Sequence, residues 1–170
     1  MPSLTTERLE LKPLPANAAV LLSEDRDKAG IVLGATLPPT WPEPNLLGLL
    51  RLRPPVSPAA EPFGVWVMID SASRTVVGDI GFKGPPDGAG TIEIGYSVNP
   101  DRRRHGYATE AARALVEWAL AQPNVRSIKA SCDPNNLPSI RTLERVGFNR
   151  SSEVDGEIQW RFGNRHDRSH

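Results

Sequence analysis

Alternating and continuous hydrophobic runs divide the chain into short strands. In residues 6–14, Leu9 and Leu11 alternate with polar residues, which predicts a first strand. An Asp-Gly pair at Asp155–Gly156 predicts a tight hairpin turn near the end of the chain. The other runs predict strands over residues 64–70, 75–83, 91–98, 125–132, 148–153 and 157–162. The chain is therefore rich in strands.

Helical patterns are clearest in the second half. Residues 107–121 carry apolar side chains at helical spacing, and Pro123 ends the pattern. A second helix follows Asn136, a suitable N-cap, and ends before Gly147, where a left-handed cap belongs. Shorter helices are predicted over 16–22 and 45–52. The apolar stripe of residues 107–121 consists of Ala108, Ala111, Ala112, Leu115, Trp118 and Ala119.

Composition indicates one folded domain. The 170 residues suffice for a single core, and residues 31–62 hold about half of the 17 prolines. We interpret residues 15–62 as an excursion that covers the sheet on the acceptor side. The pattern becomes regular from Phe63, and 164–170 are a polar tail. The alternation of strands and helices predicts a mixed α/β sheet without internal repeats.

Charge and cysteine content narrow the function. Twenty basic and twenty acidic residues cancel, which argues against a nucleic-acid partner. One cysteine, Cys132, excludes an internal disulfide and a cysteine-based zinc site, and we expect no metal. No window approaches the roughly 18 apolar residues of a membrane span. We expect a cytoplasmic protein with no membrane partner; the sequence leaves the oligomeric state open, a homodimer included.

The basic turn before residue 107 is a candidate anion site. A helix start presents unpaired N–H groups and a positive dipole end, to which a diphosphate can bind. Gly106 allows close approach, and three arginines and a histidine add charge. A Walker lysine is absent. Taken alone, the same turn fits an ordinary solvated helix start. The basic residues are Arg102, Arg103, Arg104 and His105.

Two neighbouring blocks make this pattern more specific. EIGYSVNPDRRRHGYATEA, followed by NNLPSIRTLERVGF, resembles the GNAT N-acetyltransferase superfamily, in particular the branch that includes the ribosomal-protein (Rim-type) N-terminal acetyltransferases. The resemblance covers 91–148. Arg104 stands where that branch often has glycine, so its side chain must point away from a bound diphosphate or reach round to it. The matching positions are Arg103, Gly106, Ala108, Asn136, Ser139, Gly147 and Phe148.

The resemblance implies a fold, a cosubstrate and a reaction. The fold would be a mostly antiparallel sheet of about seven strands with about four helices, splayed between the fourth and fifth strands. Acetyl-CoA would donate its acetyl group directly to a primary amine of a small molecule or a protein N-terminus. A backbone N–H at Ser97 or Val98 would stabilise the oxyanion. The implied acetyl-CoA ligands are Ser97, Val98, Arg103, Arg104, His105, Gly106, Tyr107, Ala108, Thr109, Asn136 and Arg141.

Two catalytic residues are predicted, each with a plainer alternative. Glu93 stands where this branch often places a carboxylate and would be the base, or else a cross-strand ion-pair partner. Ser139 would position or protonate the departing thiolate, or else cap its own helix. Many relatives carry a tyrosine at the position of Leu143, so its absence favours a second hypothesis, a non-catalytic acyl-CoA-binding module. Trp41 would line the acceptor pocket or simply cover the sheet.

Overall fold

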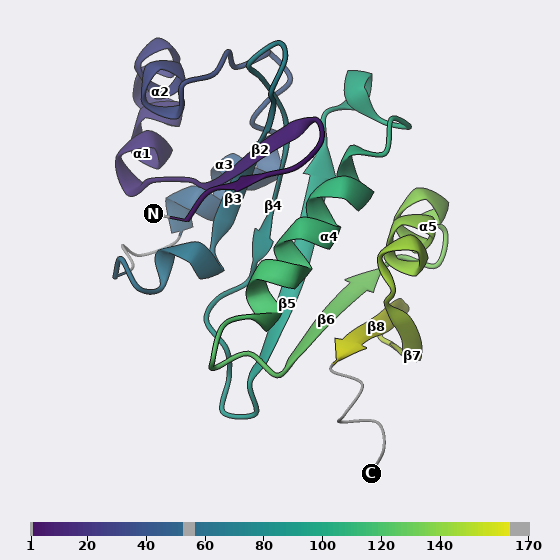
Figure 1. The fold of residues 1–170 in the computed structure, drawn as a ribbon. Helices are drawn as coiled ribbons and strands as arrows, with labels where there is room; N and C mark the ends of the chain where they lie inside the picture. The colour runs from purple at the N-terminus through teal and green to yellow at the C-terminus, as the bar shows by residue number, and fades with distance from the viewer. Residues whose placement is uncertain (1, 53–56, 164–170) are drawn as a thin grey trace.

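One continuous sheet forms the frame of the molecule. The structure, a computed structural model, describes residues 2–52 and 57–163, so the predicted tail 164–170 lies outside the described residues. Within that part the strand order is β1-β2-β3-β4-β5-β6-β8-β7 (Figure 1). The strands are β1 (Leu4–Thr5), β2 (Leu9–Pro13), β3 (Val65–Asp70), β4 (Thr75–Phe82), β5 (Thr91–Val98), β6 (Ser127–Cys132), β7 (Asn149–Val154) and β8 (Glu157–Gly163).

The sheet opens between its two central strands. All neighbouring strands are antiparallel except β5 and β6, which are parallel. The β5–β6 register runs only from Thr91↔Ser127 to Glu93↔Lys129, after which the strands diverge (Figure 1). On its other side, β5 stays paired with β4 as far as Val98. The predicted splay lies between the fourth and fifth strands counted from the sequence, which are β5 and β6 in the labels used here. It is therefore confirmed.

Five α-helices cover the two faces of the sheet in the described residues. On one face, α1 (Ala16–Glu24), α2 (Arg26–Leu33) and α3 (Pro44–Leu52) pack against alternate residues of β3, including Val67 and Ile69. On the other face, α4 (Tyr107–Leu120) and α5 (Leu137–Val146) share a core with Trp66 and Met68. Short 3₁₀ turns occur at η1 (Glu61–Phe63) and η2 (Pro100–Arg102).

The predicted elements of the second half are confirmed, and two details of the first half differ. The expected strand over 6–14 is shorter, β2, and a strand β1 that was not predicted precedes it; the Thr6 N–H donates to the Leu9 carbonyl and closes the turn between the two. The helix α2 was not predicted. It begins at Asp25, whose carboxylate accepts the Lys28 N–H, and ends at Gly34 with φ of 68°.

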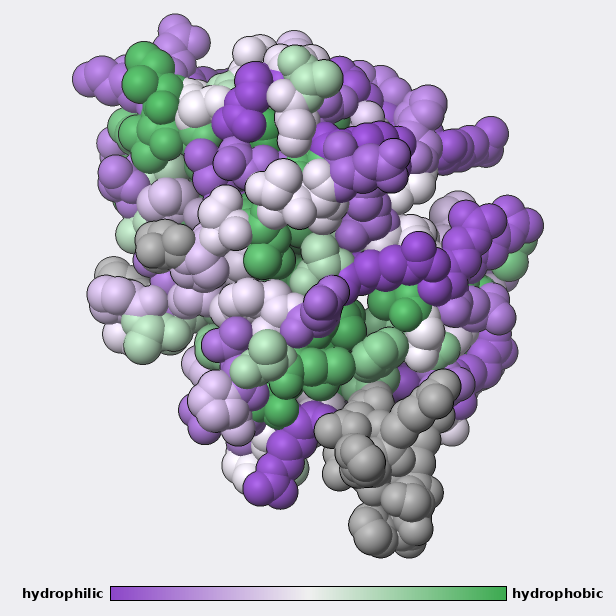
Figure 2. All heavy atoms as spheres, in the orientation of Figure 1, coloured by the Kyte–Doolittle hydropathy of each residue, from purple (hydrophilic) through white to green (hydrophobic). Residues whose placement is uncertain are grey.

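Hydrophobic side chains gather in two places on the face seen in Figure 2, at its upper left and in a band across its lower half. A hydrophobic patch lies over α2, where Ile31 is 79% exposed and Val32 is 39% exposed. Among the described residues, no helix is both long enough and apolar enough to cross a membrane.

Candidate active site

The open edge of β5 is the centre of the candidate site. We use this name for the side of Ile94–Val98 that faces away from β4. The Asn99 N–H donates to Val77 and the Glu93 carbonyl accepts from Lys83, so odd-numbered residues direct their backbone groups toward β4. Backbone groups alternate along a strand. The N–H groups of Tyr96 and Val98 therefore face the open edge, which favours Val98 over Ser97 as the oxyanion donor.

The basic turn leads directly from this edge to α4. Gly106 precedes the helix with φ of 81°, a left-handed conformation that glycine adopts without steric cost. Arg104 also lies in the left-handed region, with φ of 68°. This explains why a glycine is common there in the resembling branch, and the arginine keeps the turn at the cost of some backbone strain. Arg104 and His105 are exposed on the turn.

Arg103 joins three parts of the site. Its Nε donates to the Val98 carbonyl at 3.0 Å, at the end of the open edge. Its Nη2 lies 3.6 Å from the Glu43 carboxylate, just before α3. The guanidinium, 57% exposed, therefore lies between the basic turn and the acceptor-side segment. This contact between segments 60 residues apart in the chain could not be read from the local motif.

The start of α4 is fixed by residues outside the motif. The Arg8 guanidinium lies 4.4 Å from the centre of the Tyr107 ring, and its Nε pairs with Glu110 at 2.8 Å. Burial raises the pKa of Glu110, but hydrogen bonds from Thr6 and Arg8 outweigh it, so the net pKa is lowered. The Tyr107 hydroxyl donates to Asp70 at 3.1 Å, away from the turn. Tyr107 can therefore offer a bound diphosphate only its backbone N–H.

The first turn of α4 and the start of α5 complete the set of predicted ligands. Ala108 and Thr109 are half-buried in the first turn of α4, and Arg141 is exposed on α5. The predicted cap is confirmed, because the Asn136 carboxamide oxygen accepts the Ser139 N–H at 3.2 Å. Asn136 itself is exposed, so its amide nitrogen is accessible from solvent.

Ser139 contacts a tyrosine that the sequence reasoning missed. Its Oγ lies 2.9 Å from the hydroxyl of Tyr96, which extends from β5 to the first turn of α5. Burial raises the pKa of the Tyr96 phenol, and the hydrogen bond with Ser139 partly opposes this rise. Leu143 is 1% exposed within the core. A phenol therefore does lie beside Ser139, supplied by β5 instead of α5.

Glu93 lies at the last paired position before the sheet opens. Its carboxylate is 2.6 Å from Lys83 Nζ and 3.9 Å from Lys129 Nζ. Both lysines belong to the sheet region around β5, one after β4 and one on β6. This arrangement has the form of the cross-strand ion pair given above as the alternative to a catalytic base.

A second carboxylate, Asp79, lies on the acceptor-side face and was also missed. The Trp41 indole N–H donates to its Oδ2 at 3.0 Å, and Trp41 itself is fully buried against the sheet. Burial raises the pKa of Asp79 from 3.8 to about 6; the Trp41 hydrogen bond opposes the rise and the charge of Glu43 adds to it. Trp41 thus fits the sheet-covering interpretation, with its polar edge directed at Asp79.

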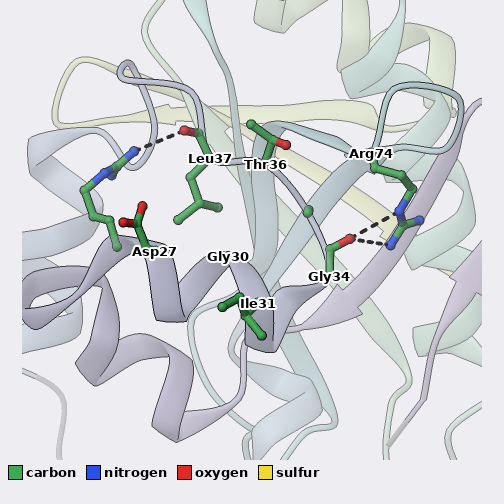
Figure 3. Close-up of a pocket in the computed structure, with 9 residues that line it drawn as sticks. Asp27, Gly30, Ile31, Gly34, Thr36, Leu37 and Arg74 are labelled. Atoms are coloured by element: carbon green, nitrogen blue, oxygen red, sulfur yellow. Dashed lines mark hydrogen bonds between the residues drawn. The ribbon is translucent and has the colours of Figure 1, made fainter.

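A separate hollow of about 530 Å³ lies between α2 and the segment that follows it (Figure 3). Arg74 donates to the Gly34 carbonyl at 3.0 Å and Arg26 to the Leu37 carbonyl at 3.3 Å, so both arginines hold the segment in place. None of the predicted site residues lines this hollow. We therefore place the candidate site at the open edge of β5.

Comparisons with known proteins agree with this geometry. The family model of the GNAT acetyltransferase domain matches residues 8–149. A Bacillus subtilis (strain 168) protein named uncharacterized N-acetyltransferase YjdG is 33% identical over 148 residues, which cover 85% of this chain and 88% of that protein. The chain therefore belongs to the GNAT acetyltransferase family.

Solved structures share the fold at low sequence identity. RimJ of Mycobacterium smegmatis, solved with CoA-disulfide, is 22% identical with a TM-score of 0.61, covering 93% of this chain and 83% of that one. The microcin C7 self-immunity acetyltransferase MccE, solved with acetyl-CoA and AMP, is 14% identical with a TM-score of 0.61, covering 93% of both chains. The predicted likeness to Rim-type enzymes is confirmed at the level of the fold.

Proposed function

We propose that this chain is an N-acetyltransferase that moves the acetyl group of acetyl-CoA directly to a primary amine. The observation that carries the proposal is the open edge of β5, which lies between the basic turn before α4 and the first turn of α5. RimJ and MccE, which share the fold, were solved with CoA-disulfide and with acetyl-CoA. The acceptor amine would belong to a small molecule or a protein N-terminus.

The donor side would hold acetyl-CoA through backbone groups and exposed cations. The diphosphate would bind the free N–H groups at the start of α4, from Gly106 to Thr109, with Arg103, Arg104 and His105 adding positive charge. The pantetheine arm would run along the open edge of β5, where the backbone groups of Tyr96 and the N–H of Val98 need partners; the Val98 carbonyl already accepts from Arg103. Asn136 and Arg141 would contact its other side from the start of α5.

The chemistry needs an oxyanion donor and an acid. The neutral amine nitrogen would attack the thioester carbonyl, whose oxygen becomes negative and is stabilised by the Val98 N–H. When the C–S bond breaks, the CoA thiolate would take a proton from the hydroxyl pair of Ser139 and Tyr96, 2.9 Å apart. The raised pKa of Tyr96 keeps the phenol protonated at neutral pH, as a proton donor requires.

Glu93 remains a candidate for the base, but its surroundings favour the ion-pair interpretation. Two ammonium groups engage its carboxylate, at 2.6 Å and 3.9 Å. In this position Glu93 on β5 would bridge Lys83, which follows β4, and Lys129 on β6, at the point where β5 and β6 begin to diverge. The ion pair would then keep β5 and β6 in register up to the last paired residue.

The non-catalytic alternative rests on Leu143, and the geometry weakens it. A binding module would need no proton donor beside the thiolate, yet Tyr96 supplies a partly buried phenol at Ser139. Leu143 packs in the core, so the tyrosine of other relatives has no direct counterpart on α5. The enzyme therefore fits the contacts of Tyr96 better than the binding module does.

The test is a thiol-release assay with acetyl-CoA against a panel of amines and peptide N-termini. We expect free CoA to form in proportion to an acetylated amine that mass spectrometry identifies. Acetyl-CoA should also raise the melting temperature, because a ligand that binds only the folded state stabilises it. A thermal shift without thiol release from any acceptor would support the non-catalytic module, and absence of both would contradict an acetyl-CoA site.

A further inference from the structure

Asp79 is an ionisable group that the chemistry above does not use, although it lies one strand away from the reacting centre. It occupies β4 directly opposite Ser97 in the antiparallel register. Residues directly opposite in such a pair lie on the same face, with their Cβ atoms about 5 Å apart. Its hydrogen bond with Trp41 identifies this face as the one covered by α1, α2 and α3. Asp79 therefore faces the acceptor side, next to the residue that precedes Val98.

Asp79 lacks the cationic partner with which a structural carboxylate usually forms an ion pair. Among the described residues, no lysine or arginine forms an ion pair with it, and its one hydrogen-bond donor is Trp41, on Oδ2. The other carboxyl groups with a shifted pKa, Asp70, Asp87 and Glu110, all have it lowered. Burying a carboxylate without a cation is costly, and such groups occur preferentially at functional sites.

There is room for an acceptor beside this carboxylate. Gly95 lies diagonally across from Asp79, two residues before Ser97 on the same face of β5. A Cβ atom added at Gly95 would meet no atom within 4 Å, so open space adjoins the strand at that point. Asp79 is only partly buried, and its Oδ1 has no hydrogen-bond partner in the described part of the chain. An acceptor placed over Gly95 would therefore lie on the same face as a carboxylate oxygen that no hydrogen bond occupies.

We propose that Asp79 is the catalytic base, which accepts the proton of the acceptor amine on the face of β5 opposite α4. The inference rests on the proposed function. As the amine nitrogen forms its bond to the acetyl carbon, its N–H proton passes to Oδ1 of Asp79, and the proton from the hydroxyl pair of Tyr96 and Ser139 goes to the CoA sulfur. The proton on Asp79 then returns to solvent, and the hydroxyl pair is reprotonated from solvent.

Trp41 and Glu43 would position and tune this base. The indole N–H fixes Oδ2 and leaves Oδ1 without a donor, while the Glu43 carboxylate adds negative charge that attracts a cationic amine. Arg103 holds Glu43 at 3.6 Å. The acceptor class that this arrangement favours is a primary amine that is cationic in solution. It loses one proton to solvent before the reaction, attacks as the neutral amine, and gives its second proton to Asp79 as the neutral amide forms.

The pH dependence follows from the charged groups around Asp79. Glu43 faces it from the segment before α3, and Arg103 contacts Glu43 from the basic turn. Glu93, with Lys83 and Lys129, lies further along β5 on the same face as Gly95. Because the base must be ionised, kcat/KM for the amine should rise with pH through about 6, the pKa of Asp79 in the folded protein.

The test compares three carboxylate-to-amide variants of the full chain. Asp79→Asn keeps an oxygen for the Trp41 N–H, so we expect it to fold and to keep its thermal shift with acetyl-CoA. Its kcat/KM should fall by about 100-fold or more. The acidic limb of the pH profile, which is the fall of kcat/KM below about pH 6, should be lost. Glu10→Gln removes a carboxylate of β2 that pairs with Arg74 at 3.0 Å, away from the site, and should keep the wild-type rate. Glu93→Gln tests the other candidate, because a large loss in this variant alone would make Glu93 the base.

Each outcome decides the proposal. A large loss in Asp79→Asn with acetyl-CoA affinity within about 2-fold of wild type supports it. A rate within about 3-fold of wild type, or an acidic limb that persists in the variant, overturns it, as does a large loss confined to Glu93→Gln. If Asp79→Asn fails to fold, the acidic limb of the wild-type profile and an Asp79→Glu variant decide instead. Absence of transfer by the wild-type chain would overturn the proposed function itself.

Discussion

The two faces of β5 differ in where along the chain their residues come from. On the face of α4 and α5, nearly every feature comes from one stretch of chain, residues 91–148, in which strand, basic turn and helix follow one another. On the opposite face, Asp79 acquires its environment from Trp41, 38 residues away along the chain. The donor side is therefore a local motif, whereas the acceptor side is a set of long-range contacts.

The two faces also differ in charge. The donor side carries the arginines of the basic turn, as a diphosphate requires, and the acceptor side carries Asp79 and Glu43, which suit an amine. Arg103 is in contact with both, through Val98 and Glu43. In the proposed enzyme, one strand would therefore separate an anionic substrate from a cationic one. The variants below test this separation, from the largest expected effect to the smallest.

The largest effect should come from Gly106→Glu, which places a carboxylate at the start of α4. We expect acetyl-CoA affinity to fall by at least about 100-fold, because the new charge opposes the diphosphate and the side chain must adopt φ near 81°. Isothermal titration calorimetry measures this. The matched control is Gly156→Glu in the β7–β8 turn, which has the same φ of 81° and open space around it. Equal affinity in the two variants would contradict the donor-side assignment.

Removing the Tyr96 hydroxyl should slow the chemistry and spare binding. In Tyr96→Phe we expect kcat to fall about 10- to 100-fold, because the proposed proton donor loses its phenol, while acetyl-CoA affinity stays within about 2-fold. Steady-state kinetics at saturating acetyl-CoA measure the change. Ser139→Ala and the double variant complete a cycle, and strictly additive losses would show that the two hydroxyls act independently.

Asp79 should leave a signature in stability that needs no substrate. Its pKa is raised in the folded state, so the stability it contributes is fully present below 3.8 and is lost as the pH rises through about 6. We expect the free energy of unfolding of wild type, relative to Asp79→Asn, to fall by up to about 2 kcal/mol between about pH 4.5 and 7.5. Urea unfolding at both pH values measures it. A difference that is constant with pH would mean that Asp79 titrates normally.

The smallest effect concerns the backbone of the basic turn. Arg104→Gly relieves the left-handed strain at φ of 68° but adds freedom to the unfolded chain, so we expect a gain of up to about 1 kcal/mol in stability. Acetyl-CoA affinity should change by less than about 3-fold if the Arg104 side chain points away from the diphosphate. Thermal unfolding and calorimetry test both points, and a large loss of affinity would show that Arg104 contacts phosphate.

The same comparison explains what could be predicted from the sequence. Local signals were sufficient for α4, for the Asn136 cap and for the Asp155–Gly156 turn, because each depends on residues a few positions apart. The helix α2 was missed although Asp25 and Gly34 mark its ends, because it buries only Ala29 and Leu33 and so lacks a continuous apolar stripe.

The site residues follow the same rule. Asp79 looks like an ordinary polar residue in an apolar strand, and Tyr96 like a routine strand aromatic, until the fold brings Trp41 and Ser139 to them. Glu93 was singled out from its place in a motif, yet its contacts are two lysines. Sequence patterns thus indicated β5 as the centre of the candidate site, while the roles of individual side chains depend on tertiary contacts.

The divergence of β5 and β6 has a consequence for the dynamics of the sheet. An exposed strand edge normally invites pairing with another chain, but here the edge lies in the middle of the sheet, between β5 and β6. A pantetheine arm that accepts and donates along Ile94–Val98 would act as the missing strand. Amide hydrogen exchange at Tyr96 and Val98 would then slow when acetyl-CoA binds, and the sheet would become continuous only while the cosubstrate is in place.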